Sequence, residues 1–185
     1  MNKTNAMRIL DKAGISYKTI TYTPDDNDLS GVHIAEQTGL NPDIMFKTLV
    51  ARGDNNSFAV FCIPVAAELD LKKCAAVSGN KRIELLAVKE LLSITGYIRG
   101  GCSPIGMKKQ FKTTINETAA AFETIIFSAG RIGYQVEVSL ENLAKVIRYE
   151  LKDICKIRSG KRLPKGTDFS PWRWKQVPLL LCCLL

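Results

Sequence analysis

Two features of the sequence could carry chemistry: a lysine in an apolar segment and a loop rich in glycine. Lys47 lies in Phe46–Ala51, FKTLVA, and residues 100–106 read GGCSPIG. A partly buried ammonium offers a fixed positive charge for a phosphate or a carboxylate. A glycine-rich loop exposes N–H donors that hold phosphate oxygens or the oxyanion of an ester under attack. Each feature also has a plain structural reading, as a lysine that faces water and as an ordinary turn.

The usual catalytic constellations are missing from the sequence. His33 is the single histidine, and a surface or capping role is typical of its place early in a predicted helix. There is no HExxH, no phosphate-binding GxxxxGK[ST] loop and no GxGxxG after a strand. Cys102 lies in the glycine-rich loop, but a cysteine nucleophile needs a base or an electropositive setting, and no histidine is near it in sequence. Six cysteines without CxxC spacing, beside one histidine, favour reduced thiols and argue against a zinc site. We expect no metal and no cofactor.

Helix caps and apolar periodicity predict the elements that must position these residues. Strands and helices alternate irregularly rather than as strict βαβ units, which predicts an α+β domain with a mixed, partly closed sheet. The expected helices follow Thr4 or Asn5, Ser30, Asp70, residue 86 and Ser139; the expected strands span 15–22, 46–51, 58–63, 124–128 and 134–138. The last helix is predicted to place Leu143, Val146, Ile147 and Leu151 on one face.

The charge divides the chain into two parts. The 185 residues carry a net charge of +8, of which +6 falls in residues 156–185 and only +2 in the remainder. We therefore expect one domain over 1–155 and a basic, apolar-ended extension over 156–185. The extension is either an arm for RNA or a membrane surface, or a disordered or non-native end. No secretory signal and no run of eighteen apolar residues is present, so we expect a cytoplasmic protein without a membrane span.

Four segments together resemble one family. They are residues 41–49 (NPDIMFKTL), 69–73 (LDLKK), 96–109 (GYIRGGCSPIGMKK) and 128–133 (SAGRIG). In order and spacing they resemble the YbaK/EbsC family, which is related to the editing domain of bacterial prolyl-tRNA synthetases, and the resemblance runs from about residue 4 to 155. It implies a single α+β domain with a mixed, barrel-like sheet flanked by helices. It also implies a freestanding deacylase that hydrolyses misacylated Cys-tRNA(Pro), and also Cys-tRNA(Cys), beside prolyl-tRNA synthetase.

The resemblance also implies roles for particular residues. Lys47 matches the essential lysine of the family, and Gly101 matches the position whose backbone borders the scissile carbonyl. The matching substrate-binding positions are Tyr22, Ser30, Thr48, Gly100, Ser103, Pro104, Ser128 and Gly130. Ser30 stands where relatives can carry an aromatic residue, and Gln135 where they can carry an acid. The implied mechanism needs no histidine, because the thiol of the attached cysteine attacks its own ester.

Two other readings stay open at the level of sequence. One is an editing deacylase for another small amino acid, such as alanine. The other is a tRNA- or nucleotide-binding module without turnover. The low charge of residues 1–155 predicts modest affinity for free tRNA, although a patch such as Lys72, Lys73, Lys108 and Lys109 could meet phosphates.

Overall fold

The helices begin at the residues that the sequence marks as caps. In the computed structural model, which describes residues 2–25 and 28–156, the side chains of Thr4, Ser30, Asp70 and Ser139 each accept a hydrogen bond from the first turn of a helix. The helices are α1 (Asn5–Lys12), α2 (Gly31–Thr38), α3 (Leu71–Ser78), α4 (Val88–Thr95), the 3-10 turn η1 (Glu117–Ala121) and α5 (Leu140–Ala144). The predicted extension, apart from Lys156, lies outside the described residues.

The strands form two sheets where the sequence predicts one, and the α+β class is as predicted. One has the order β1-β7-β6 and the other the order β4-β2-β3-β5-β8. The strands are β1 (Lys18–Thr21), β2 (Phe46–Gly53), β3 (Phe58–Pro64), β4 (Ile83–Leu85), β5 (Lys112–Asn116), β6 (Ile125–Arg131), β7 (Tyr134–Val138) and β8 (Tyr149–Lys152). The five-stranded sheet is mixed, because β3 and β8 both pair with β5 in parallel while β2 and β3 form an antiparallel hairpin.

The final helix is shorter than predicted. It ends at Ala144, and Tyr149–Lys152 forms β8. In that segment Tyr149 and Leu151 are half-buried while Glu150 and Lys152 are exposed, which is the alternation of a strand. Pairing with β5, 35 or more residues away along the chain, therefore overrides the helical spacing of Leu143, Val146 and Ile147.

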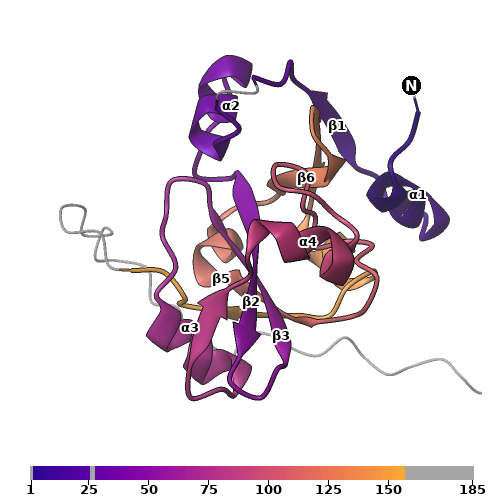
Figure 1. Ribbon diagram of the computed structural model, residues 1–185. Coiled ribbons are helices and arrows are strands. Elements are labelled where there is room, and N and C mark those ends of the chain that lie inside the picture. The colour runs from indigo at the N-terminus through magenta and orange to yellow at the C-terminus, as the bar shows by residue number, and fades with distance from the viewer. Residues whose placement is uncertain (1, 26–27, 157–185) are drawn as a thin grey trace, which may run out of the picture.

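The two sheets enclose the main core, and β2 joins them at its beginning. Phe46, Val50 and Cys62 from the larger sheet pack with Phe127 and Val136 from the smaller one. A parallel bridge pairs Met45 with Ile126, and the Ile126 N–H donates to the Ile44 carbonyl at 2.8 Å. Figure 1 shows α2 set apart above the upper end of β2, with α3 near the lower end of the larger sheet. Lys47 thus follows directly after the junction of the sheets.

No helix in the described part of the chain is long and apolar enough to span a bilayer.

Candidate functional site

Lys47 holds a half-buried ammonium group just after the junction. Its Nζ donates to the Val65 carbonyl at 2.9 Å and makes no other hydrogen bond within the described residues. Burial lowers the pKa of Lys47 below its ordinary value of 10.5, and the charge of nearby Glu68 partly opposes that shift. Since a lysine ammonium carries three N–H donors, two remain for a phosphate, a ribose hydroxyl or a carbonyl oxygen.

Thr48, the next residue, faces the opposite side of the sheet. Successive side chains of a strand alternate between faces, and the neighbours of Thr48 on its face, Phe46 and Val50, lie in the core between the sheets. The Thr48 hydroxyl lies 3.7 Å from the sulfur of Cys62, which belongs to the same core. The structure therefore does not place the side chains of Lys47 and Thr48 together.

The glycine-rich loop packs against the turn between β6 and β7. Gly100 has a φ of +80°, which only glycine adopts without strain, and a Cβ there would come within 3.2 Å of Leu29. A Cβ on Gly101 would lie 3.3 Å from the backbone nitrogen of Ile132. The Gly101 N–H donates to the Ile98 carbonyl at 3.0 Å, so it is engaged in the loop's own turn. The N–H of the next residue, Cys102, makes no hydrogen bond within the described residues.

Ser103 and Pro104 shape this loop from its buried side. Both residues are buried, and the Ser103 hydroxyl accepts a hydrogen bond from the Ile105 N–H at 3.3 Å. The Ile105 carbonyl in turn accepts from the Tyr97 hydroxyl at 2.6 Å. These contacts hold the loop in place from its buried side.

The beginning of α2 links the loop to Lys47. Ser30 caps this helix by accepting from the His33 N–H at 3.2 Å, and the preceding residue, Leu29, contacts Gly100. Gly31 lies so close to Val65 that a Cβ would come within 2.2 Å of its side chain. Because the Val65 carbonyl also accepts from Lys47, the segment 29–31 lies between the glycine-rich loop and the residue that holds the Lys47 ammonium.

The bulged end of β6, just before its turn into β7, contributes Ser128 and Gly130. The Ser128 hydroxyl accepts from the Gly130 N–H at 3.2 Å, within a bulge between Ser128 and Arg131. Gly130 has a φ of +89°, and a Cβ there would lie 2.7 Å from the Tyr97 ring. Tyr97 thereby ties this turn to the glycine-rich loop.

Gln135 is a residue that the sequence marks only as a departure from the family. Gln135 is 7% exposed. Among the buried side-chain nitrogen and oxygen atoms of the described residues, its Oε1 is the one without a hydrogen-bond partner. Gln135 pairs with Ser128 on β6 and with Ile20 on β1. A buried acceptor without a donor is costly, so it marks a position where a ligand's donor would bind. In the sequence Gln135 alternates with the apolar Tyr134, Val136 and Val138, as Glu137 does, so the pattern alone predicts a solvent-facing residue and gives no signal of its burial.

Tyr22 lies at the edge of the same turn. Its N–H donates to the Gly133 carbonyl at 3.1 Å, and its side chain packs with Met45 and Ile126 beneath α2. Tyr22 also lines a shallow cavity of about 490 Å³ along β1.

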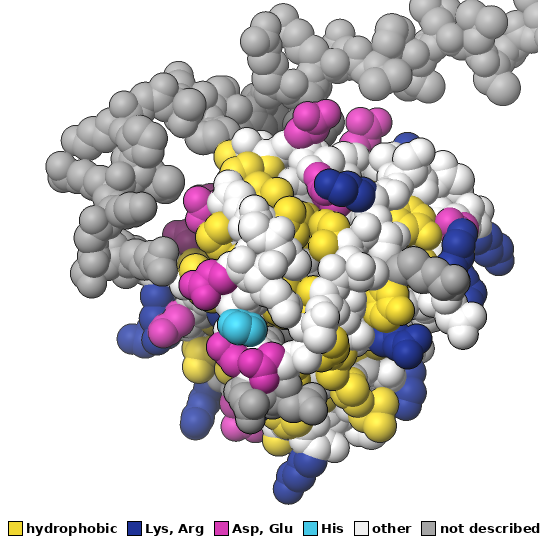
Figure 2. All heavy atoms as spheres, turned by 90° about the horizontal axis from the view of Figure 1, so that it is seen from above, with side chains coloured by type: hydrophobic (Ala, Val, Ile, Leu, Met, Phe, Trp, Pro, Cys, Tyr) yellow, Lys and Arg dark blue, Asp and Glu magenta, His cyan; other side chains and the backbone are white. Residues whose placement is uncertain are grey.

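The remaining sequence candidates do not act as nucleophile and base. Burial raises the pKa of Cys102 to about 12, so its thiol is neutral near pH 7. His33 lies on α2 with its Nε2 3.7 Å from Asp25, and Figure 2 shows carboxylates around it on the molecular surface. Of the predicted basic patch, Lys73 is paired with Asp153 at 2.6 Å.

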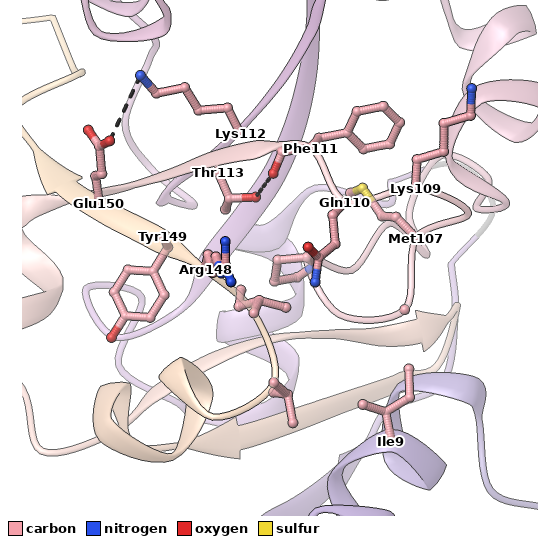
Figure 3. A pocket seen from close by; sticks show the side chains of 14 residues that line it. Ile9, Met107, Lys109, Gln110, Phe111, Lys112, Thr113, Arg148, Tyr149 and Glu150 are labelled. Carbon is pink, nitrogen blue, oxygen red and sulfur yellow. Dashed lines mark hydrogen bonds and ion pairs between the residues drawn. The ribbon is translucent and has the colours of Figure 1, made fainter.

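A second cavity, of about 560 Å³, lies on the other side of the glycine-rich loop. Figure 3 shows its lining from residues 104–113 and 146–150, with Ile9 at one end. Pro104 is the predicted site residue that it includes.

Comparison with known proteins gives a consistent result. The model of a family described as the aminoacyl-tRNA editing domain matches residues 30–146. A candidate Cys-tRNA(Pro)/Cys-tRNA(Cys) deacylase, EbsC of Enterococcus faecalis (strain ATCC 700802 / V583), is 44% identical over 152 residues, which is 82% of this chain and 93% of that protein.

Solved structures share the fold at low sequence identity. The crystal structure of a hypothetical protein, APE2540, matches with a TM-score of 0.75 and 16% identity over 83% of this chain and 100% of that one. A candidate trans-editing enzyme for prolyl tRNA synthetase matches with a TM-score of 0.72 and 17% identity, over 85% and 100% of the two chains. These likenesses confirm the predicted α+β fold.

Proposed function

The chain belongs to the aminoacyl-tRNA editing domain family, and on that premise we propose that it deacylates Cys-tRNA(Pro) and Cys-tRNA(Cys). The observation that carries the proposal is the Lys47 ammonium, which is half-buried and uses one of its three N–H donors. Its partner, Val65, packs against Gly31, and Leu29 of the same segment lies beside Gly100 of the glycine-rich loop. A fixed cation at such a place suits the 3′-terminal ribose and the ester of an aminoacyl-tRNA.

The substrate supplies the nucleophile in this proposal. The cysteinyl thiol loses its proton and its sulfur bonds to the ester carbonyl carbon, giving a tetrahedral oxyanion. The carbon–oxygen bond to the ribose then breaks, the ribose oxygen takes a proton, and the amino acid leaves as a cyclic thiolactone. Water opens the thiolactone afterwards to give free cysteine.

In this reaction the protein positions the thiol against the carbonyl and stabilises the negative charge of the oxyanion. Holding the thiol against the carbonyl supplies about 7–11 kcal/mol of the barrier. One preorganised donor to the oxyanion supplies about 3–4 kcal/mol. Because the Gly101 N–H is already bonded to Ile98, the donors proposed here are the free N–H groups of Lys47 and the main-chain N–H of Cys102.

Gln135 and the turn beside it are proposed to hold the amino acid. The Gln135 oxygen lacks a donor, and the α-ammonium of an aminoacyl ester is one. Ser128, opposite Gln135 across the β6–β7 pair, would border the same group, with Tyr22 at the edge. We further propose that residues 1–155 form the whole deacylase, acting in the cytoplasm in trans to prolyl-tRNA synthetase.

A panel of aminoacyl-tRNAs tests the function. Purified protein is expected to deacylate Cys-tRNA(Pro) and to leave Ser-tRNA(Pro) intact, because a hydroxyl in place of the thiol is a far weaker nucleophile at neutral pH. Appearance of the thiolactone, detected by mass spectrometry before it hydrolyses, is the positive evidence for thiol participation. Equal rates on the two esters would reject the substrate-assisted route, and binding of both without cleavage would reject the deacylase.

A further inference from the structure

The cavity of about 560 Å³ beside the glycine-rich loop, called the basic groove below, is not used by the site described above. It lies between residues 104–113 and 146–150. Apolar side chains of Ile9, Met107, Val146 and Ile147 line it, together with the half-buried Phe111 and Tyr149.

Three cations stand around this lining against a single carboxylate. Lys109, Lys112 and Arg148 are exposed, and Figure 3 shows Arg148 near Gln110, with Lys112 extending toward Glu150 on one side and Lys109 on the other. Lys112 approaches Glu150 at 3.8 Å, but both side chains are about half exposed, so that pair is weak. Lys109 and Arg148 form no ion pair with any described residue. Cations over an apolar and partly aromatic lining are the pattern that binds single-stranded nucleic acid, through phosphates and stacked bases.

The groove shares the glycine-rich loop with the candidate site. Pro104 and Gly106 line the groove, and Gly101 lies five residues or fewer before them. Five residues span at most about 18 Å, so the groove lies within a few nucleotides of the ester position. The loop is held in place here, because Asn5 of α1 donates to the Gly106 carbonyl at 3.1 Å.

An approach over α2 is unfavourable to a polyanion such as RNA. Asp25, Asp28, Glu36 and Asp43 belong to α2 and the segments beside it, and Figure 2 shows acidic side chains gathered around His33 on that face. Phosphates approaching over α2 would meet like charge, whereas those entering along the groove meet Lys109 and Arg148.

We propose that the basic groove binds the sugar-phosphate backbone of the single-stranded 3′ end of the tRNA while its ester lies at Lys47. The inference rests on the proposed function for the identity of the RNA, but it concerns a separate surface and is measured separately. Each phosphate contact by a cation contributes a salt slope of about 0.7 for single strands, which amounts to about fivefold in affinity at 0.1 M salt. Loss of two contacts is thus expected to weaken binding by about 25-fold.

The test compares two double variants for binding of uncharged tRNA across a salt titration. Lys109→Gln/Arg148→Gln removes the unpaired cations of the groove. Arg82→Gln/Lys89→Gln is the matched control, since both residues are exposed, line no part of the groove and make no side-chain ion pair with described residues. The groove variant is expected to lower the slope by about 1.4 and the affinity by about 25-fold, with little change in the control.

Deacylation separates the failure of this inference from failure of the proposed function. The groove variant is expected to lose kcat/KM on Cys-tRNA(Pro) and to keep the wild-type rate on cysteinyl-adenosine, which is too short to reach the groove. Equal salt slopes for the two double variants, or an equal loss on both esters, would overturn the groove assignment while leaving the deacylase intact. Wild-type protein that cleaves neither ester would instead reject the function, and the tRNA titration would still decide the groove.

Discussion

Replacing Gln135 by Met is expected to make the protein more stable. The Gln135 Oε1 is buried without a hydrogen-bond partner, and an unsatisfied buried acceptor costs about 1–3 kcal/mol. Methionine has nearly the same shape and length without the polar oxygen, so it removes that cost while filling the same space. For a chain of this size, each kcal/mol raises Tm by about 2–4 °C.

The same substitution is expected to lower activity. If the oxygen accepts a hydrogen bond from the α-ammonium of the substrate, its loss forfeits about 1.5–3 kcal/mol, because one partner is charged. That range corresponds to a fall of roughly 10- to 150-fold in kcat/KM. A gain in stability that accompanies a loss of activity distinguishes a ligand-binding position from a purely structural one.

Urea unfolding and Cys-tRNA(Pro) deacylation measure the two effects on the same preparations. Gln37→Met is the control, since Gln37 is exposed on α2 and its replacement is expected to change stability by about 0.5 kcal/mol or less. A Gln135→Met protein that is less stable than wild type would refute the reasoning, because the oxygen would then have a partner in the native state. A more stable variant with unchanged kcat/KM would refute the contact with substrate.

Three further predictions concern single residues of the site. Lys47→Met is expected to lower kcat by about 10²–10³-fold with a small change in Tm, measured by deacylation and thermal unfolding. Burial lowers the pKa of Lys47, so as the pH rises the ammonium loses its charge at a lower pH than an exposed lysine would. Wild-type activity should therefore decline on the alkaline side of the pH–rate profile, and the profile of the Met variant should lack that decline. Cys102→Ala is expected to keep deacylation within a few-fold of wild type, and the native Cys102 thiol to resist iodoacetamide at pH 7, since its pKa is about 12. Gly130→Ala is expected to cost about 1–3 kcal/mol in urea unfolding, because φ is +89° and the new methyl group meets Tyr97; a neutral substitution would contradict the strain argument.

Local signals in the sequence predicted the helix starts well. Thr4, Ser30, Asp70 and Ser139 are short polar residues before an apolar run, and each one caps a helix as expected. A cap depends on the hydrogen bonds of one turn, so neighbouring residues contain almost all the information needed.

Local signals did not predict the strands that depend on long-range pairing. β5 is a run of Lys112–Asn116 with two threonines, and β8 follows a short helix without a strong break. Both become strands because β5 pairs with β3 on one side and with β8 on the other. These partners lie far away along the chain, so a short stretch of sequence does not reveal the pairing.

The site was predictable in its position but not in the direction of its side chains. Lys47 and Thr48 are neighbours in a predicted strand, and a strand must send them to opposite faces. The structure puts Thr48 on the face of Phe46 and Val50, in the core between the sheets, and Lys47 on the other face. Gln135 became a candidate only when the structure left its oxygen without a donor.

The cysteines of the described chain bear on the proposed chemistry as well. A thiolactone is an acylating agent, and the thiolate is the form of cysteine that it would modify. Burial raises the pKa of Cys62, Cys74 and Cys102 to about 12, and that of Cys155 to about 11. Near neutral pH all four therefore remain thiols, although Cys155 is close enough to Lys47 for the lysine's charge to lower its pKa slightly. A protein that releases a reactive product beside its own sulfur atoms is protected when those atoms are neutral, and here burial in the core provides that protection.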